Sequence, residues 1–375
     1  MITINGKSFN IEKPLICRVR FDSSIFNKTE SDFLFTSNIN NFTARHNGYI
    51  LNADFTGNIN SKAVFKPNSN NNFFNDGDIF LIESNGQATK LYDASSKTNA
   101  VLLTEKCNCN CITCPQPPKK LDEKEWIDIC LKAIELMNPN MECLGVTGGE
   151  PTIEWDGLIN ILRKCGIYLP NTMIQLLTNA RIFTDYNKAC EISKLHNNLF
   201  YSIPLYSDIN TIHDKMTSTK GSFWDTVEGI YNIELTGKPI ELRIVITKLN
   251  YDRLPQFAEF VYKTMPFVES VAFMGMEPIG KALKNLDLLW IDPIDYSKYI
   301  EKAVNILWKR DIPSMIFNHQ LCTLPKNIWP LAKKSISEWK IIYVDECERC
   351  AEKENCGGFF FSSRHHKSKG IIPIL

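Results

Sequence analysis

Short apolar runs alternate with helix-like segments from residue 99 to about 315, and this alternation constrains the fold more than any other feature of the chain. Six runs have the length and composition of strands: 101–104, 143–147, 173–177, 199–205, 240–247 and 268–274. The segments between them, such as 158–165, 224–235 and 254–264, have apolar residues at helical spacing. Because strand–helix–strand units are right-handed and join parallel strands, the pattern predicts an α/β fold, as a partial or complete α/β barrel. Such barrels place their chemistry at the carboxyl ends of the strands.

Several helix ends are marked in the sequence. Asp122 with Glu125 three residues later has the spacing of a capping box, and Pro139 closes the same segment. Gly166 follows the segment 158–165 and predicts its end. Beyond the sixth strand we expect a helix near 295–309 and a strand near 315–318.

Residues 1–98 have a different pattern, which indicates an accessory β-rich domain. Alternating or apolar runs at 15–21, 48–55 and 78–83 are separated by turn-forming residues. Ser84-Asn85-Gly86 predicts a hairpin, because Asn-Gly tolerates the positive φ angles of a tight turn. The asparagine-rich stretch 68–75 predicts a surface loop. The expected domains are therefore 1–98, 99–315 and 316–375, the last a cysteine-rich tail too short for a large core of its own.

Composition excludes several classes of function. Among the 375 residues, 42 Lys and Arg balance 42 Asp and Glu, so the whole molecule has no net attraction to nucleic acid or to an anionic membrane. No apolar stretch reaches the roughly 18 residues of a membrane helix. The first residues lack the pattern of a secretory signal. We therefore expect a cytoplasmic protein that binds neither nucleic acid nor membrane.

Thirteen cysteines are many for a chain that is expected in a reducing compartment, where structural disulfides are rare. Closely spaced cysteines are then expected to be metal ligands or catalytic thiols. Five stand alone and are expected to be small buried core residues: Cys17, Cys130, Cys143, Cys165 and Cys190. The other eight form two groups.

The first group follows the first strand directly. Cys107, Cys111 and Cys114 form the pattern C-x3-C-x2-C within one loop. Three thiolates on one loop can hold three corners of a [4Fe–4S] cluster and leave the fourth iron open to a small chelating molecule. A zinc site is the alternative, in which Cys109 supplies the fourth ligand. In the cluster interpretation Cys109 has no assigned role.

The second strand ends in Thr147-Gly148-Gly149-Glu150-Pro151. Two glycines permit a close approach of the backbone, and a carboxylate just beyond a strand accepts hydrogen bonds from an ammonium group. The combination of this turn with the three-cysteine loop upstream is a specific signal.

On these two motifs, residues 99–315 resemble the radical S-adenosylmethionine (SAM) superfamily. The resemblance implies a partial (β/α)6 barrel in which Cys107, Cys111 and Cys114 bind a [4Fe–4S] cluster. The amino and carboxylate groups of SAM would chelate the open iron, and the Gly148-Gly149-Glu150-Pro151 turn would bind the amino group. An electron from the cluster would cleave a C–S bond of SAM, giving methionine and a 5′-deoxyadenosyl radical that abstracts hydrogen from the substrate.

The same resemblance suggests further SAM contacts near the strand ends, each with ordinary polar packing as its alternative: Thr178, Asn179, Ser202, Arg243 and Glu277. Ser202 would reach a ribose hydroxyl, Arg243 the SAM carboxylate and Glu277 the surroundings of the adenine. The superfamily usually has an aromatic residue before the third cysteine, where this chain has Thr113.

The second group comprises Cys347, Cys350 and Cys356, with Cys322 upstream. Four thiolates can coordinate a second, auxiliary [4Fe–4S] cluster completely, and a structural zinc ion is the alternative. The tail resembles the twitch/SPASM-like extensions of peptide-modifying radical SAM enzymes. That resemblance implies a cluster that relays an electron or positions the substrate.

Longer stretches resemble a narrower family, the HxsC-like C-type maturases of His-Xaa-Ser systems: LLTEKCNCNCITCPQPPK, VTGGEPT, IPLYSDINTIHD, GMEPIG, NHQLCTLP and CERCAEKENCGGFF. This resemblance implies an enzyme that modifies a ribosomally made precursor peptide. A second radical SAM protein and an electron donor are the implied partners.

Two other functions fit the same motifs. One is a radical SAM enzyme acting on a small molecule in cofactor biosynthesis. The other is a non-catalytic iron–sulfur subunit of a maturase complex, although a scaffold has no need of an open iron. His213-Asp214 and His319 are candidate acid–base residues, for which helix capping or core hydrogen bonding is the alternative. His365-His366 are expected in a solvated tail.

Overall fold

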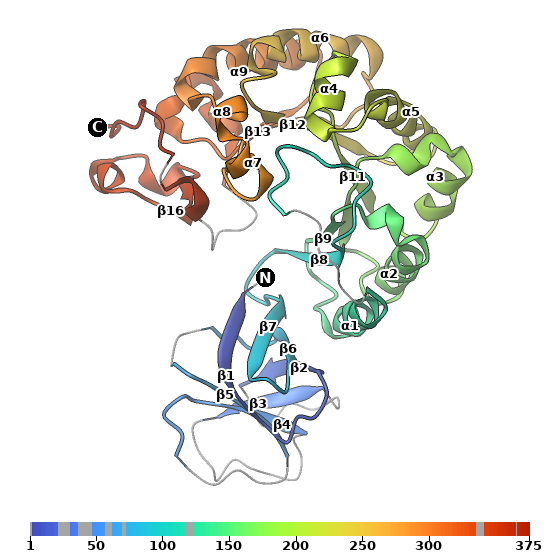
Figure 1. Ribbon diagram of the computed structural model, residues 1–375, viewed down its shortest axis with the longest axis vertical. Helices are drawn as coiled ribbons and strands as arrows, with labels where there is room; N and C mark the ends of the chain where they lie inside the picture. Colours follow the sequence, from blue (N-terminus) through green and yellow to red (C-terminus); the bar gives the residue numbers. More distant parts are fainter. Residues whose placement is uncertain are drawn as a thin grey trace.

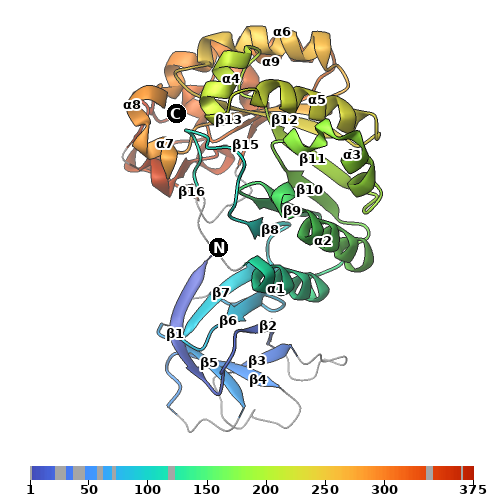
Figure 2. The ribbon, with the colours of Figure 1, turned by 45° about the vertical axis from the view of Figure 1, so that its right-hand side comes forward.

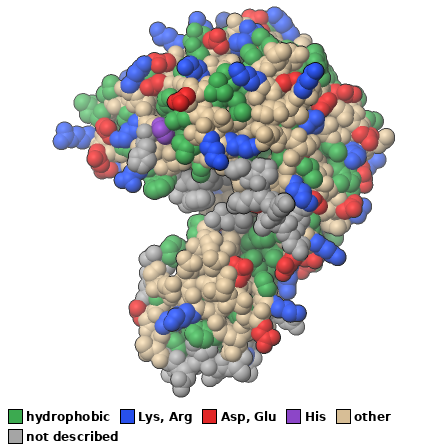
Figure 3. Space-filling view, in the orientation of Figure 1, with side chains coloured by type: hydrophobic (Ala, Val, Ile, Leu, Met, Phe, Trp, Pro, Cys, Tyr) green, Lys and Arg blue, Asp and Glu red, His purple; other side chains and the backbone are tan. Residues whose placement is uncertain are grey.

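The structure, a computed structural model, describes residues 2–21, 31–36, 47–56, 62–69, 73–116, 123–334, 341–364 and 366–375. Figure 1 shows a small β-barrel at the N-terminal end, a larger α/β body, and a C-terminal segment that lies beside the last strands of that body. Basic and acidic side chains intermingle over the face seen in Figure 3. Among the described residues, no helix is both long and apolar enough to cross a membrane.

The N-terminal part is a closed barrel with the strand order β1-β5-β4-β3-β2-β6-β7. Its strands are β1 Thr3–Phe9, β2 Leu15–Arg20, β3 Asp32–Thr36, β4 Gly48–Leu51, β5 Ala63–Pro67, β6 Ile79–Ile82 and β7 Gln87–Tyr92. Aromatic and branched side chains, among them Phe33, Ile50, Phe65 and Phe80, fill its interior. The expected β-rich region is confirmed.

The hairpin expected at Ser84-Asn85-Gly86 is present between the antiparallel strands β6 and β7. Gly86 has a φ of 86°, and its N–H donates to the carbonyl oxygen of Glu83 at 3.2 Å. Asn85 contributes differently from expectation, because it has no positive φ and instead accepts a hydrogen bond from the Gln87 N–H at 2.9 Å. Part of the expected asparagine-rich loop, residues 70–72, lies outside the described residues.

The body is built on one parallel sheet with the order β15-β14-β13-β12-β11-β10-β9-β8. Its strands are β8 Thr98–Thr104, β9 Cys143–Gly148, β10 Met173–Leu177, β11 Leu199–Pro204, β12 Ile240–Ile246, β13 Ser270–Gly275, β14 Ser314–Phe317 and β15 Ala332–Lys333. The six expected strands are confirmed, as is the strand expected near 315–318. The sheet therefore has eight strands instead of six, because β14 and the two-residue β15 continue it beyond the sixth. The expected boundary between residues 315 and 316 falls inside β14.

Helices cover the outer, convex face of this sheet (Figures 1 and 2). The helices of the body are α1 Glu123–Leu136, α2 Trp155–Tyr168, α3 Tyr186–Ser193, α4 Asn210–Thr217, α5 Ser222–Glu234, α6 Leu254–Thr264, α7 Lys281–Lys284, α8 Leu286–Leu289 and α9 Pro293–Trp308. The spacing of buried residues explains their docking. In α6, for example, Leu254, Phe257, Ala258 and Val261 recur on one face and are fully buried.

One expected helix end differs from the structure, and one expected helix start lies outside the described residues. α2 runs through Gly166 to Tyr168, so the prediction that Gly166 ends this helix is wrong. A Cβ at Gly166 would lie 2.9 Å from the Leu195 carbonyl oxygen, so the glycine permits close packing instead of a helix end. Asp122 lies outside the described residues, and its capping role stays a prediction.

Short elements make up the C-terminal segment. They are the antiparallel strands β16 Ile341–Ile342 and β17 Phe359–Phe360 and the 3-10 turns Leu321–Thr323, Lys326–Leu331, Asp345–Arg349, Lys353–Asn355 and Phe361–Ser363. Of the solitary cysteines, four are buried and Cys190 is partly buried, as expected for small packing residues.

The barrel packs against α1 on the side of the sheet where the strands begin. Ile16, Leu81 and Tyr92 of the barrel belong to the same apolar core as Met137 and Met141, which connect α1 to β9.

Candidate active site

The cysteine loop, residues 107–114, leaves β8 and crosses the carboxyl ends of the neighbouring strands. Helix α4 holds its middle through main-chain hydrogen bonds. The Asn110 N–H donates to the Thr217 carbonyl oxygen at 3.0 Å, and the Ile112 N–H donates to that of Met216 at 2.9 Å. These groups lie in the last turn of α4, where helix carbonyls lack partners within the helix.

Helix α7 holds the end of the same loop. The Lys281 N–H, at the first residue of α7, donates to the Cys114 carbonyl oxygen at 2.9 Å. The Asn285 side chain donates to the Ile112 carbonyl oxygen at 3.2 Å. The loop backbone is therefore fixed on two sides by elements that are far from it in sequence.

The four cysteines of the loop differ in exposure. Cys107, Cys111 and Cys114 are partly exposed, whereas Cys109 is only 8% exposed. Hydrogen bonds with the thiols of Cys107 and Cys111, and further ones with Arg181 and Thr219, lower the pKa of the Cys109 thiol. The same contacts with Cys109, together with burial, raise the pKa of the Cys107 and Cys111 thiols.

The glycine pair after β9 lies directly against the chain that enters the cysteine loop. A Cβ at Gly148 would lie 2.4 Å from the Thr104 carbonyl oxygen, and one at Gly149 would lie 2.2 Å from that of Lys106. The N–H groups of Gly149 and Glu150 donate to these two oxygens, each at 2.8 Å. Glycine is required here because any side chain would separate the two backbones.

Glu150 is 1% exposed, and both of its carboxylate oxygens have partners within the protein. Oε1 accepts hydrogen bonds from the Thr152 hydroxyl and the Thr178 hydroxyl, each at 2.7 Å, and from the Thr152 N–H at 3.2 Å. Oε2 accepts from the Asn179 N–H at 2.7 Å. Burial raises the pKa of Glu150, and these donors act against that rise. Glu150 thereby joins the turn after β9, which Pro151 begins as a 3-10 helix, to the end of β10.

Thr178 and Asn179 bring the end of β10 to the cysteine loop. The Asn179 side chain donates to Oδ1 of Asn108 at 2.6 Å. The turn is tight, and Ala180 within it adopts a φ of 63°. The Ala180 carbonyl oxygen lies so close to Gly229 of α5 that a Cβ at Gly229 would be only 2.1 Å from it. These two predicted site residues are therefore placed beside the predicted cluster ligands.

Ser202 and Arg243 lie within one buried polar group inside the curved sheet. The Ser202 hydroxyl donates to Oε1 of Glu241 at 3.0 Å and accepts from the Gln175 side chain at 2.9 Å. Nε of Arg243 donates to the same Glu241 oxygen at 2.5 Å. Their SAM contacts stay predictions, and their partners here are protein side chains.

Glu277 follows β13 and connects the sheet edge to the C-terminal segment. Its Oε1 accepts a hydrogen bond from the Ser362 hydroxyl at 2.9 Å. An aromatic ring does lie beside Thr113, since the hydroxyl of buried Tyr206, which follows β11, is hydrogen-bonded to the Thr113 side chain.

The four cysteines of the second group, Cys322, Cys347, Cys350 and Cys356, line one cavity of about 370 Å³. Residues 371–374 of the C-terminal segment line the same cavity. Sγ of Cys356 accepts from the N–H groups of Leu321 and Gly358, each at 3.5 Å. Burial raises the pKa of Cys322 and Cys347.

A second cavity, of about 440 Å³, lies at the carboxyl ends of β12 and β13 and beyond β14. Trp290, Asn318 and His366 are among its lining residues. Gln320 and Phe359 line both cavities. The second cysteine group is therefore separated from the carboxyl edge of the sheet by single side chains.

A profile of the radical SAM superfamily matches residues 101–261, from β8 into α6. This part of the chain is therefore similar to radical SAM domains. The matched residues contain the cysteine loop and the Gly148-Gly149-Glu150-Pro151 turn.

Similar proteins match about half of the chain. An uncharacterized protein of Methanocaldococcus jannaschii is 30% identical over 184 residues, which is 48% of this chain and 62% of that protein. A GTP 3′,8-cyclase of Petrotoga mobilis is 25% identical over 47% of this chain and 55% of the relative. The chain thus spans less than two thirds of the curated relatives it matches. Among solved structures, Streptococcus suis SuiB is 15% identical, with a TM-score of 0.47 over 60% of this chain and 50% of SuiB.

Two of the candidate acid–base residues, His319 and Asp214, have structural partners. Nδ1 of His319 donates to the Phe317 carbonyl oxygen at 2.8 Å, so Nε2 accepts from the Tyr296 hydroxyl at 2.9 Å. Burial lowers the pKa of His319 to about 4. Asp214 accepts from the N–H groups of Gly221 and Phe223 at the start of α5. Core hydrogen bonding and helix capping are thereby confirmed for these residues; His365 lies outside the described residues.

Sequence reasoning missed the residues that hold the cysteine loop: Arg181, Met216, Thr217, Lys281 and Asn285. Arg181 carried a signal, because it follows Thr178 and Asn179 at the end of a predicted strand. The others act mostly through main-chain groups of short helices, which leave no pattern in the side chains.

Proposed function

We propose that this chain is a radical SAM enzyme whose cysteine loop binds a [4Fe–4S] cluster through Cys107, Cys111 and Cys114. The observation that carries the proposal is the placement of this loop. Three partly exposed thiols lie at the carboxyl ends of parallel strands, on a backbone that α4, α7 and the glycine pair hold in place. A loop with three ligands leaves the fourth iron available to SAM.

The donor set fits this group better than it fits a single ion. Thiolates are the ligands that iron–sulfur clusters use. Within the parts of the chain that are described, no set of three or more His, Cys, Asp or Glu side chains is arranged to hold one metal ion.

When bound, the cluster would supply the electron that cleaves SAM. The chain's own residues prepare the site. Glu150 and Thr178 fix the turns after β9 and β10, and the glycine pair keeps the first turn against the loop. Because both Glu150 oxygens already accept hydrogen bonds, we place the SAM amino group at main-chain carbonyls of that turn.

We further propose that the substrate is a ribosomally made precursor peptide. The resemblance to His-Xaa-Ser maturases supports this, as does the four-cysteine cavity next to the carboxyl edge. An auxiliary [4Fe–4S] cluster in that cavity would have all its irons bound by protein, which suits electron relay or substrate positioning more than substrate ligation. A second radical SAM protein and an electron donor are the proposed partners.

A small-molecule substrate is the second candidate. The similarity to the GTP 3′,8-cyclase of Petrotoga mobilis and to a protein of Saccharolobus islandicus named "Probable GTP 3′,8-cyclase" favours it. These matches cover 47% and 54% of this chain.

SAM cleavage by the anaerobically reconstituted, reduced protein separates the candidates. A synthetic peptide with His-Xaa-Ser repeats and GTP serve as probes, and release of 5′-deoxyadenosine is measured by chromatography. We expect the peptide, and not GTP, to accelerate release. Acceleration by GTP alone would overturn the peptide proposal. No release under any condition, with the partner protein present, would support a non-catalytic subunit instead.

A further inference from the structure

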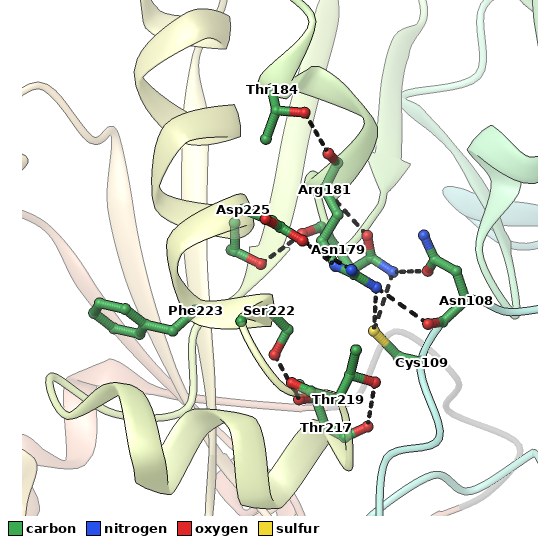
Figure 4. A network of polar contacts seen from close by, with 12 residues as sticks. Asn108, Cys109, Asn179, Arg181, Thr184, Thr217, Thr219, Ser222, Phe223 and Asp225 are labelled. Carbon is green, nitrogen blue, oxygen red and sulfur yellow. Dashed lines mark hydrogen bonds and ion pairs between the residues drawn. The ribbon is translucent and has the colours of Figure 1, made fainter.

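The cysteine loop contains a fourth thiol that the proposed cluster does not use. Sγ of Cys109 lies 3.6 Å from Nδ2 of Asn179 and 3.8 Å from Nη1 of Arg181 (Figure 4). Its side chain points into the protein, toward the turn after β10, while the three proposed ligands are partly exposed. The structure therefore treats this sulfur differently from its neighbours.

Arg181 is held at both ends of its guanidinium group. Nη1 donates to the Asn108 carbonyl oxygen at 3.1 Å, next to its contact with Cys109. Nε and Nη2 donate to Oδ2 of Asp225 at 3.0 and 2.8 Å. Asp225 lies in the first turn of α5, so this ion pair ties the loop to a helix that packs on the sheet.

Holding Cys109 matters because its sulfur is close to two proposed ligands. The thiols of Cys107 and Cys111 are both hydrogen-bonded to it. All four thiolates are equivalent in chemistry, so iron does not distinguish them by type. If Cys109 reached the fourth iron, the cluster would have four protein ligands and no position for SAM.

We propose that Arg181, oriented by Asp225, is a positioning residue that keeps Cys109 off the cluster, so that one iron stays open. Asn179 assists by donating to the same sulfur. The inference rests on the proposed function, since it presupposes a cluster on Cys107, Cys111 and Cys114. It gives Cys109 a role that the spacing of the cysteines does not reveal, as a thiol that the protein keeps away from the cluster.

The test uses the full-length, reconstituted protein and four variants: Arg181→Gln, Asp225→Asn, Cys109→Ala and the double variant Arg181→Gln with Cys109→Ala. Arg253→Gln is the matched control, because Arg253 forms a similar two-bond ion pair with Asp208 outside the cysteine loop. The measured quantities are iron content and the fraction of the reduced cluster whose electron paramagnetic resonance (EPR) spectrum changes when SAM is added.

We expect Cys109→Ala and Arg253→Gln to match the wild type. Arg181→Gln is expected to lower the ratio of SAM-responsive to unresponsive cluster by about tenfold. A tenfold change in this ratio corresponds to the free energy of about one hydrogen bond to a charged group. Asp225→Asn is expected to lower it less. The double variant is expected to recover the response, because the competing thiol is absent; a purely structural role for Arg181 would not allow this recovery.

Three results would overturn the inference while leaving the proposed function intact. They are a wild-type response in Arg181→Gln, no recovery in the double variant, and a loss of iron in Cys109→Ala. Absence of a SAM-responsive cluster in the wild type itself would overturn the proposed function instead.

Discussion

The two cysteine groups are built in different ways. The cysteine loop, residues 107–114, has a backbone that α4, α7 and the turns after β9 and β10 hold by hydrogen bonds, and three of its sulfurs are partly exposed. The second group lines a cavity within a segment of 3-10 turns and two-residue strands. The fold fixes the backbone of the first group, whereas the second group, in which Cys322, Cys347 and Cys350 are likewise partly exposed, belongs to a segment of short elements.

This difference indicates two roles for the proposed clusters. A backbone that the fold already holds can present a cluster with an open iron, because its geometry does not depend on a fourth ligand. A short segment with little regular structure gains most from four bonds to one metal centre.

Replacing Cys107, Cys111 and Cys114 together by Ala is expected to have the largest effect. The chain should bind about eight irons when both clusters are present, and the triple variant about half of that. SAM cleavage should be lost entirely, because no iron is left open. Iron analysis and release of 5′-deoxyadenosine are the measurements. Retention of SAM cleavage would contradict the assignment of this loop.

Replacing Cys347 and Cys350 by Ala is expected to remove the other half of the iron. SAM cleavage should be spared more than peptide modification, because the second group lies beyond Gln320 and Phe359 from the carboxyl edge of the sheet. Mass spectrometry of the peptide and the nucleoside assay give the two rates. An equal loss of SAM cleavage and of peptide modification would contradict separate roles for the two cysteine groups.

Gly149→Ala and Gly357→Ala form a matched pair of backbone tests. A Cβ at Gly149 would lie 2.2 Å from a main-chain oxygen, whereas one at Gly357 would lie 3.4 Å from its nearest neighbours. Gly149→Ala should lower the free energy of unfolding by about 2 kcal/mol, as overpacking does, and should reduce the iron bound by the cysteine loop. Gly357→Ala should change neither. Denaturant unfolding with iron analysis checks this, and equal effects would show that the loop is not braced as described.

His319 gives the smallest and most specific test, at the junction between β14 and the second group. Its pKa in the folded chain is about 4, below the value of about 6.5 in an unfolded chain. The unfolded state therefore binds more protons between these values, so stability is complete above pH 6.5 and decreases as the pH falls toward 4. At pH 5.5 the loss is about 1.4 kcal/mol. His319→Gln should remove this part of the pH dependence, and unchanged dependence in denaturant unfolding would contradict the assignment.

Much of the sheet could be predicted from the sequence, because its central strands are five to seven residues long and mostly apolar. The strand β15 could not, since two residues carry no periodic pattern. Helices α4 and α7 were missed for a similar reason, with eight and four residues. They hold the cysteine loop mainly through backbone groups, which sequence patterns do not report.

The candidate site was predicted in outline. The cysteine loop, the glycine pair, Thr178 and Asn179 are brought together as expected, because parallel strands end at the same edge. Glu150 illustrates what the sequence could not provide, since its carboxylate is used inside the protein to join two turns. Ser202 and Arg243 likewise have buried partners, which depend on the register between β10, β11 and β12.

EPR spectroscopy of the reduced, reconstituted protein, recorded with and without SAM, tests the central claim most directly. The account predicts a [4Fe–4S] signal that requires Cys107, Cys111 and Cys114 and that changes when SAM binds its open iron. A signal that requires those cysteines but stays identical at saturating SAM would contradict the account, because the fourth iron would then have a protein ligand.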